Sequence, residues 1–257
     1  MGDTPWRMVK SLLNKKEREL SKLTVAEGPP SVLGAISSQA RLEMIVVSDA
    51  FRDSDRWDEF QAAVSEHPAP GEIHNVSDSL YERMSGTRSP QGVLCVLPFP
   101  FDFHLPLSPS PWKHRLYVLG VDIQDPGNVG TLTRTAAAAG ASEMLFLGNS
   151  ADPYSPKCIR ASAGAAFGVN LRAECDPVAT LSALEKSGIR IFGAVPLGGI
   201  HPWEAEFACD CGILLGNEGQ GLRPEIVLKP GQGLSIPMPG GIESLNVAAA
   251  SAMILYE

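Results

Sequence analysis

Short apolar runs and helix-forming segments alternate regularly along the second half of the chain, from residue 113 to residue 257. The apolar runs, which predict strands, fall at 116–121, 144–147, 168–171, 189–195, 212–215 and 234–236. The segments that predict helices fall at 128–139, 155–163, 176–187, 222–228 and after 245. Strands that alternate with helices pair in parallel, and the helices cover both faces of the sheet. The pattern predicts an α/β domain whose ligand site lies in loops at the carboxyl ends of the strands.

A proline-rich stretch separates this domain from the first part of the chain. Residues 98–112 contain five prolines, which exclude a continuous helix and favour an extended connector. We therefore expect an N-terminal domain at 1–97, a linker at 98–112 and a second domain at 113–257. The predicted helices of the N-terminal domain fall at 5–22, 56–66 and 77–84, and its predicted strands at 42–47 and 92–97. It is expected to be a small α/β unit.

Composition argues against two classes of protein. The five cysteines are scattered without a CxxC pair and the five histidines without an HExxH motif, so we expect no metal site. No apolar run approaches the ~20 residues of a membrane-spanning helix, and no basic segment with an apolar core opens the chain. We expect a cytoplasmic protein without a membrane partner.

The distribution of charge bears on nucleic-acid binding. The formal net charge of −8 is unfavourable for contact with phosphate groups. Residues 1–24 nevertheless carry six basic against three acidic side chains, which is a local charge of +3. A basic N-terminal helix could contact RNA, although a solvated surface helix explains the same pattern.

The loop at 122–134, DIQDPGNVGTLTR, follows a predicted strand and leads into an alanine-rich helix. Asn128 and Thr131 lie near the start of that helix, where free backbone N–H groups and the helix dipole favour an anion. Arg134 follows on roughly the same face as Thr131. The spacing alone is equally consistent with Asn128 as a helix cap and Arg134 as a surface residue.

Two further loops follow predicted strands nearer the end of the chain. Residues 216–221, GNEGQG, contain three glycines that let the backbone approach a ligand, but they match no nucleotide-phosphate fingerprint. Glu218 within this loop could pair with a cation or could simply be solvated. In the loop at 236–246, IPMPGGIESLN, either Ser244 or Asn246 could cap the following helix. Three such loops in one parallel-sheet domain indicate one composite site.

Taken together and in order, these loops resemble the three signature motifs of the SpoU/TrmH family of RNA ribose 2′-O-methyltransferases. NVGTLTRTA at 128–136 is similar to the first motif, LLGNEGQGL at 214–222 to the second, and residues 236–257 to the third. The resemblance extends upstream to the family's N-terminal substrate-binding domain, which is similar to small ribosomal proteins that bind bent RNA. The upstream segments are EGPPSV at 27–32, IVVSDAF at 45–51 and SGTRSPQGVLCV at 85–96.

The resemblance implies a fold that the residues alone do not predict. Members of the family have a C-terminal trefoil knot, whereas the rules of chain connectivity disfavour knots. The knot loops hold S-adenosylmethionine in a bent conformation, and the site is completed across a homodimer interface. By match to the motifs, the residues implied at the cofactor are Gly216, Ile236, Met238, Leu245 and Asn246.

The resemblance also implies a catalytic group, which consists of Asn128, Arg134, Glu218, Ser244 and Asn246. A ribose hydroxyl is a poor nucleophile near neutral pH, so the charge that develops on its oxygen must be stabilised. A guanidinium, with a pKa above ~12, rarely gives up its proton. We therefore expect Arg134 to hold the target phosphate and stabilise that charge, while Glu218 and Asn128 orient the arginine and the cofactor.

Three alternatives for the function follow from the same residues. The separate N-terminal domain is more similar to rRNA-modifying members of the family, so we expect large-subunit rRNA as the substrate, with tRNA as the alternative. A non-catalytic RNA-binding factor in ribosome assembly is a different class, which the presence of all five catalytic-type residues disfavours. A nucleotide-dependent oxidoreductase is disfavoured because neither glycine fingerprint is present.

Overall fold

The computed structural model describes residues 5–99, 113–174 and 176–257. Its residues form two compact units. The first unit contains the described residues up to 99 and, in addition, Tyr154–Gly168. The second unit contains the other described residues. Residues 154–168 thus belong to the first unit by their contacts, although they fall within the range 113–257 expected for the second domain. Most of the proline-rich linker expected at 98–112 lies outside the described residues.

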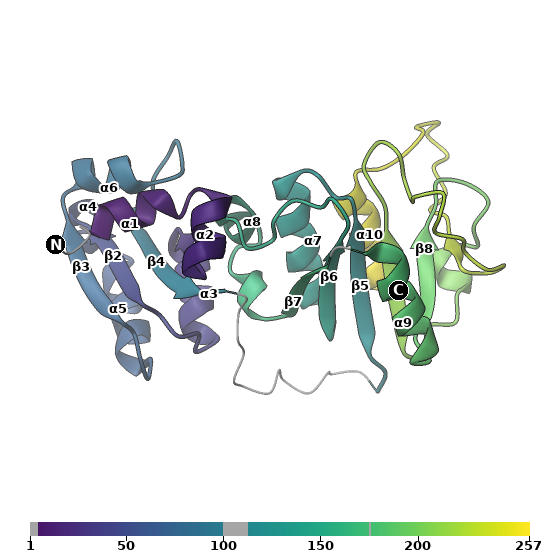
Figure 1. The fold of residues 1–257 in the computed structure, drawn as a ribbon, viewed down its shortest axis with the longest axis horizontal. Coiled ribbons are helices and arrows are strands. Elements are labelled where there is room, and N and C mark those ends of the chain that lie inside the picture. Colours follow the sequence, from purple (N-terminus) through teal and green to yellow (C-terminus); the bar gives the residue numbers. More distant parts are fainter. Residues whose placement is uncertain (1–4, 100–112, 175) are drawn as a thin grey trace. The chain divides into compact units, whose positions relative to one another are not determined.

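The first unit has a four-stranded sheet in the order β1-β4-β2-β3 (Figure 1). The strands are β1 (Leu23–Glu27), β2 (Met44–Ser48), β3 (Glu72–Val76) and β4 (Val93–Pro98). Strand β4 runs antiparallel to both of its neighbours, whereas β2 and β3 are parallel. The sheet is therefore mixed, and its central strand β4 is buried along nearly its whole length.

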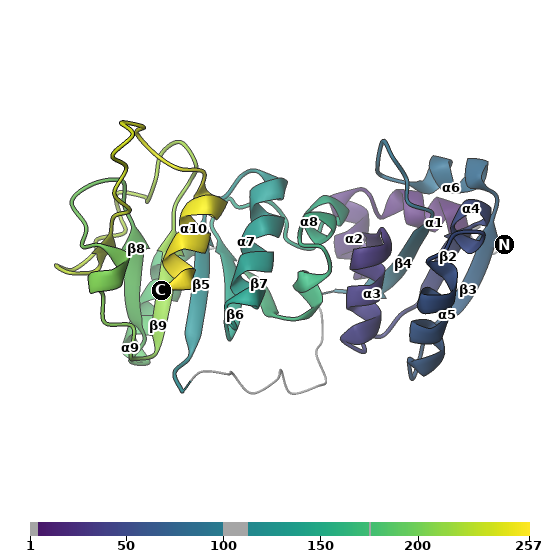
Figure 2. The same cartoon turned by 180° about the vertical axis from the view of Figure 1, so that it is seen from behind.

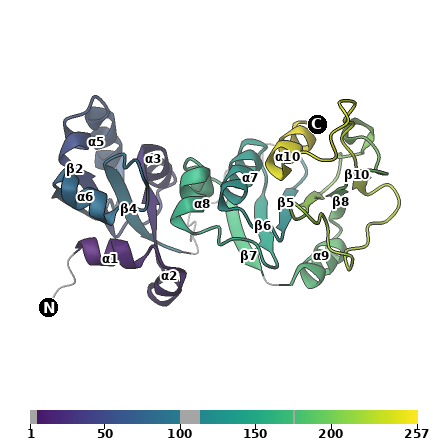
Figure 3. The ribbon, with the colours of Figure 1, turned by 90° about the horizontal axis from the view of Figure 1, so that it is seen from above.

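Helices cover both faces of this sheet (Figure 3). They are α1 (Pro5–Ser11), α2 (Lys15–Ser21), α3 (Pro29–Ser37), α4 (Asp49–Arg52), α5 (Trp57–Glu66), α6 (Asp78–Met84) and α8 (Pro156–Ala161). Successive side chains of a strand point to opposite faces. On β4, Cys95 and Leu97 join the core under α3 and α5, whereas Leu94 and Val96 join the core under α1 and α6.

The segment 154–168 is an integral part of the first unit. Ile159 of α8 and Phe167 of the short 3₁₀ helix Ala165–Phe167 are buried in the core that also contains residues of α3 and α5. The Thr24 hydroxyl of β1 donates a 2.7 Å hydrogen bond to the Tyr154 carbonyl. At the crossing with α3, a Cβ on Gly34 would lie only 2.6 Å from Cα of Gly164, so the two backbones can approach only because both residues are glycine.

The second unit has a six-stranded sheet in the order β10-β8-β9-β5-β6-β7, and all of its strand pairs are parallel. The strands are β5 (Leu116–Val121), β6 (Glu143–Leu147), β7 (Asn170–Glu174), β8 (Arg190–Ala194), β9 (Cys211–Leu215) and β10 (Gly233–Leu234). The predicted α/β domain with a parallel sheet is confirmed.

Helices also cover both faces of the second sheet. They are α7 (Pro126–Ala138), α9 (Pro177–Lys186), α10 (Val247–Tyr256) and the 3₁₀ helix Pro202–Glu204. Helices α7 and α10 pack against each other on one face (Figure 2), while α9 packs on the opposite face over Leu119, Leu145 and Leu214. Among the residues that the structure describes, no helix is both long and apolar enough to cross a membrane.

The helix predicted at 5–22 is broken in the structure. A turn separates α1 from α2, and Asn14 caps α2 by accepting a 2.9 Å hydrogen bond from the backbone N–H of Lys16. Arg18 then folds back to donate to the carbonyl groups of Leu12 and Leu13, at 3.0 and 3.1 Å. Because Arg18 is buried and serves the end of α1, it does not contribute to a basic surface for RNA.

Two predictions in the second half of the chain are wrong. Residues 222–228 form no helix, because Pro224 excludes the helical conformation at Arg223. The apolar side chains Leu222, Ile226 and Leu228 pack on the core under α9 without helical geometry. The strand expected at 168–171 is shifted to 170–174, because Phe167 is buried in the first unit and the sheet begins only after it.

Candidate active site

Helix α7 begins in the first of the three loops, and Asp125 rather than Asn128 caps it. One carboxylate oxygen of Asp125 accepts hydrogen bonds from the backbone N–H groups of Gly127 at 2.6 Å and Asn128 at 3.1 Å. Pro126 occupies the first helical turn, where its missing N–H costs nothing. The interpretation of Asn128 as a cap is therefore wrong, and its side chain is free to bond elsewhere.

The Asn128 side chain joins all three loops. Its Nδ2 donates a 2.9 Å hydrogen bond to Oε1 of Glu218 in the second loop. Its Oδ1 accepts a 3.0 Å hydrogen bond from Nδ2 of Asn246 in the third loop. An amide can donate and accept at once, which a carboxylate or an ammonium group cannot do. The three loops that the sequence singled out are therefore connected through one side chain.

Each partner of Asn128 is fixed by its own backbone contacts. Asn246 caps α10, since its Oδ1 accepts from the backbone N–H groups of Ala248 at 2.9 Å and Ala249 at 3.3 Å. Glu218 accepts further hydrogen bonds from the backbone N–H groups that begin the first loop, those of Gln124 and Asp125, at 3.4 and 3.3 Å.

The environment of Glu218 favours its ionised form. Partial burial raises the pKa of the Glu218 carboxyl, but the hydrogen bonds from Asn128 and from the backbone outweigh burial, and the net pKa is lowered. The site therefore presents a negative charge at neutral pH.

The second loop is a tight turn organised by Asn217. Its backbone exchanges two 2.9 Å hydrogen bonds with Gly221, and its side-chain oxygen accepts from the N–H groups of Gly219 and Gln220 at 2.9 and 3.0 Å. A Cβ on Gly216 would overlap the backbone of Gly221, so only glycine allows the turn to close here. The Asn217 side chain therefore fixes the backbone on either side of Glu218.

An ion pair ties the second loop to the first. Both Nε and Nη2 of Arg223 donate to the carboxylate of Asp122, the latter at 2.6 Å. The Arg223 guanidinium holds the pKa of the Asp122 carboxyl below its usual range. Asn217 adds a 2.8 Å hydrogen bond from its Nδ2 to the Asp122 carbonyl oxygen. The two loops are thus held together independently of Asn128.

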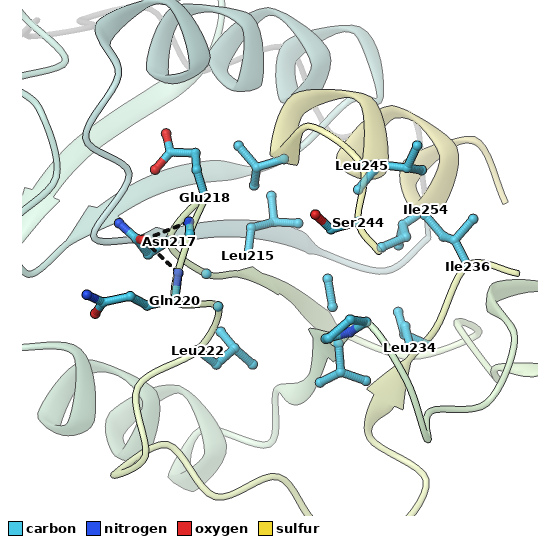
Figure 4. A pocket seen from close by; sticks show the side chains of 18 of the residues that line it. Leu215, Asn217, Glu218, Gln220, Leu222, Leu234, Ile236, Ser244, Leu245 and Ile254 are labelled. Carbon is cyan, nitrogen blue, oxygen red and sulfur yellow. Dashed lines mark hydrogen bonds between the residues drawn. The ribbon is translucent and has the colours of Figure 1, made fainter. Parts of the chain in front are cut away.

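A cavity of about 440 Å³ lies beside this network, at the carboxyl ends of β8, β9 and β10 (Figure 4). The predicted residues that line it are Gly216, Glu218, Ile236, Met238, Ser244 and Leu245. In Figure 4 the polar side chains Asn217, Glu218 and Gln220 lie at one end, and the apolar side chains of Ile236, Leu245 and Ile254 lie at the other. The volume is typical of a site for a small molecule or cofactor.

Arg134 is the one predicted residue that the described structure does not bring to this site. It is exposed on α7 and does not line the cavity. Its guanidinium has no hydrogen-bond or ion-pair partner among the described residues. The cavity and the Asn128 network therefore bring together eight of the nine predicted residues, all except Arg134.

Comparison with known sequences identifies the family. The SpoU rRNA methylase family matches residues 115–256, which contain the cavity and the Asn128 network. The chain belongs to the SpoU rRNA methylase family. An MRM3-like substrate-binding domain matches residues 7–95 of the first unit.

Relatives of this SpoU family member cover most of its length. An uncharacterised tRNA/rRNA methyltransferase from Synechocystis is 30% identical over 203 residues, which are 78% of this chain and 73% of the relative. The 23S rRNA (guanosine(2553)-2′-O)-methyltransferase RlmP from Bacillus subtilis is 27% identical over 247 residues, or 96% and 92% of the two chains.

Solved structures of SpoU relatives agree with this fold. The AdoMet-bound rRNA methyltransferase from Sinorhizobium meliloti has a TM-score of 0.80 at 25% identity, with 99% of this chain and 93% of that chain covered. A TrmH-family putative RNA methyltransferase from Porphyromonas gingivalis has a TM-score of 0.80 at 30% identity, with 100% and 97% covered.

The sequence reasoning missed several residues that shape this SpoU site. Asp125 directly precedes Pro126, and an acidic residue before an N-terminal proline is a recognisable helix start. The pairing of Asp122 with Arg223, which are 101 residues apart, has no local signal. Among the described residues, no group of His, Cys, Asp and Glu side chains is placed to hold a metal ion.

Proposed function

We propose that the protein transfers the methyl group of S-adenosylmethionine to the 2′-oxygen of a ribose in large-subunit rRNA. Membership of the SpoU rRNA methylase family supports this, and so does similarity to a relative named as a 23S rRNA 2′-O-methyltransferase. The observation that carries the proposal is the Asn128 side chain, which joins the three motif loops beside the 440 Å³ cavity.

The residues of the cavity fit this cofactor, which is bound in the Sinorhizobium structure. When bound, S-adenosylmethionine supplies an electrophilic methyl group on a cationic sulfur. Ile236, Leu245 and Ile254 form an apolar wall suited to an adenine ring, while the ionised Glu218 places negative charge near a cationic ligand. Gly216 and Met238 would contact the same molecule, and Asn246 would hold α10 against it through its cap.

We assign the chemical step to groups of this chain that position the RNA. Asn128 holds Glu218 in its ionised form, and Ser244 presents a hydroxyl to the cavity. Arg134 would bind the phosphate next to the target ribose and stabilise charge on the attacking oxygen, and the proton of the 2′-hydroxyl would leave to solvent. Alignment of that oxygen with the methyl group supplies most of the rate.

We further propose that the active protein is a cytoplasmic homodimer whose catalytic fold contains a C-terminal trefoil knot. In a dimer, Arg134 of one protomer would complete the cavity of its partner. The free guanidinium of Arg134 supports this, and so do the exposed apolar side chains Met253 and Tyr256 on α10, which are 51% and 89% accessible.

Labelled S-adenosylmethionine incubated separately with total rRNA and total tRNA, followed by nucleoside mass spectrometry, tests the function. We expect a 2′-O-methylnucleoside in rRNA only. The Arg134→Lys variant should lower kcat at least ~100-fold, as loss of one charge-stabilising donor does, and leave the Kd for the cofactor unchanged. Arg190→Lys is the matched control, since Arg190 is an exposed arginine of the same unit outside the site.

The other outcomes separate the alternatives. Label in tRNA alone would mean that the methyl transfer is as proposed but that the substrate is tRNA. RNA binding without any methyl transfer would contradict the proposal and favour the non-catalytic assembly factor. An unchanged kcat in Arg134→Lys would remove this residue from the mechanism.

A further inference from the structure

The first unit contains a second polar cavity, of about 310 Å³, at the end of β1. Glu27, Gly28, Ser31, Thr87, Gln91 and Arg160 are among the residues that line it. We propose that this cavity binds one unstacked nucleotide of the RNA, with Arg160 and Gln91 reading the edge of its base. The proposal rests on the proposed function in that it takes RNA as the substrate, and it gives the first unit a defined subsite.

The buried carboxylate of Glu27 holds the residues around the cavity in place. Its carboxylate is only 2% accessible and accepts hydrogen bonds from the Ser85 hydroxyl, from the Gly86 N–H at 3.2 Å and from the Thr87 hydroxyl at 3.4 Å. These contacts fix the loop that precedes β4. Because three donors already satisfy Glu27, this carboxylate serves to hold its surroundings in place rather than to bind a ligand.

Arg160 is held at the edge of the cavity by the same carboxylate. Its Nη1 lies 3.6 Å from Oε2 of Glu27 and is itself buried without a hydrogen-bond partner among the described residues. The Arg160 side chain is 35% accessible, so the guanidinium still presents N–H groups outward. A guanidinium that is held by a carboxylate on one side has its remaining N–H groups pre-organised to donate two hydrogen bonds to a planar ligand.

Gln91 and Ser31 complete the hydrogen-bonding surface. A Cβ on Gly28 would lie 2.8 Å from Oε1 of Gln91, and Gly28 has a φ of +91°, so glycine at this position makes room for the amide. Ser31 is buried in the first turn of α3 and also lines the cavity. The wall therefore offers both donors and acceptors.

The charge of the cavity favours a base over a bare phosphate. Glu27 offsets the charge of Arg160, so an anion would meet a carboxylate behind the guanidinium. The edge of an unstacked base is neutral and carries both acceptors and donors, which match a guanidinium, an amide and hydroxyl groups. The volume also lies at the low end of the range for small-ligand sites, which suits one nucleotide.

Arg160, which lines this cavity in the first unit, comes from the part of the sequence that matches the methylase family. Arg160 lies within the range matched by the SpoU methylase family, 115–256, but its contacts are in the first unit. The match to the substrate-binding domain ends at residue 95. The nucleotide subsite is therefore incomplete in the first 99 residues alone and requires the segment 154–168.

Filter binding of the full-length protein to an in vitro transcript of large-subunit rRNA, without cofactor, tests the proposal. Arg160→Lys keeps the positive charge beside Glu27 but removes the planar pair of N–H donors. We expect the Kd for RNA to rise about tenfold, which is the effect of losing one side-chain contact with a base. Gln91→Ala should act in the same direction. The matched control is Arg41→Lys, an exposed arginine of the first unit paired with Glu43 at 3.0 Å, whose Kd should stay within about twofold of the parent.

The outcomes separate this proposal from the proposed function. Equal Kd values for Arg160→Lys and Arg41→Lys, with unchanged melting temperatures, would overturn the nucleotide subsite even if methyl transfer is normal. Competition by inorganic phosphate as effective as that by nucleoside monophosphates would also overturn it. Selective loss of RNA binding in Arg160→Lys and Gln91→Ala would support the subsite, whether or not the parent protein methylates RNA.

Discussion

The two units each contain a polar network, and the two networks are built in opposite ways. In the first unit a buried carboxylate, Glu27, accepts hydrogen bonds from hydroxyl and N–H groups and pairs with the guanidinium of Arg160. In the second unit an amide, Asn128, stands between Glu218 and Asn246 at the protein surface. A buried charge with all its donors in place makes a rigid support. A half-buried amide that joins three loops leaves the site open to a ligand.

Glycine residues mark a difference between a helix crossing in the first unit and the third loop of the second unit. Gly34 and Gly164 of the first unit allow two backbones to touch, and a methyl group at either position would collide with main-chain atoms. Gly240 and Gly241 of the second unit have nothing within 4 Å of a Cβ built on them. Close packing therefore fixes the crossing of α3 with the segment 154–168, while the third loop of the second unit has free space beside its two glycines.

The largest effect that we expect comes from Gly164→Ala. Gly164 has a φ of +88°, and a methyl group there would collide with the Pro30 carbonyl, so unfolding should become easier by about 3 kcal/mol. Hydrogen exchange measured by mass spectrometry should show lost protection in the first unit, including α3. Gly168→Ala is the matched control, because Gly168 has a φ of −110° and an ordinary 3.6 Å contact. Equal loss of protection in both variants would show that close packing is not the cause.

A smaller effect on stability, but a clear one on catalysis, is expected from Asn246→Asp. Aspartate keeps the oxygen that caps α10 but loses the N–H group that donates to Asn128. We expect a melting temperature near that of the parent and a kcat reduced about tenfold or more. Asn246→Ala should lose both functions and about 1 kcal/mol of stability. If the aspartate variant has full activity, the bond between the first and third loops is not needed for catalysis.

The smallest effect concerns the pH dependence of the Asp122–Arg223 pair. The folded pKa of Asp122 is below its ordinary value, so the pair stabilises the folded state above about pH 4, and this contribution is lost as pH falls through the folded pKa. Asp122→Asn should lower Tm by about 2–4 °C at pH 7, and the difference should shrink below pH ~4. Glu185→Gln, which removes an exposed ion pair with Lys229, is expected to change Tm little at either pH. If the difference in Tm between Asp122→Asn and the parent protein does not depend on pH, packing rather than the ion pair causes it.

The sequence predicted the second unit better than the first for a physical reason. Strands such as β5 and β9 are buried on both faces and appear as continuous apolar runs, which are easily recognised. Strand β3 lies at the edge of the first sheet and is largely polar, EIHNV, so it carries no alternating pattern. The residues of β1 directly follow the expected helix at 5–22, which concealed both its break at Asn14 and the strand after it.

The site was predicted as a set of loops but not as a network. Motif similarity located Asn128, Glu218 and Asn246, and their type and order were sufficient for that. The contacts among them depend on the parallel sheet, which brings the ends of separate strands to one edge. No local pattern indicates that Arg223 pairs with Asp122 or that Arg160 lies beside Glu27, because each pair is joined only by tertiary structure.

The contribution of residues 154–168 to the first unit has a consequence for synthesis of the protein on the ribosome. The first 99 residues are translated before Ile159 and Phe167, yet the core of the first unit contains both of these side chains. The bond between Thr24 and Tyr154 closes a loop of 130 residues, and contacts that are so distant in sequence form slowly. Part of the apolar surface of the nascent N-terminal region therefore stays exposed until the ribosome has translated residues 154–168, which lie within the catalytic sequence.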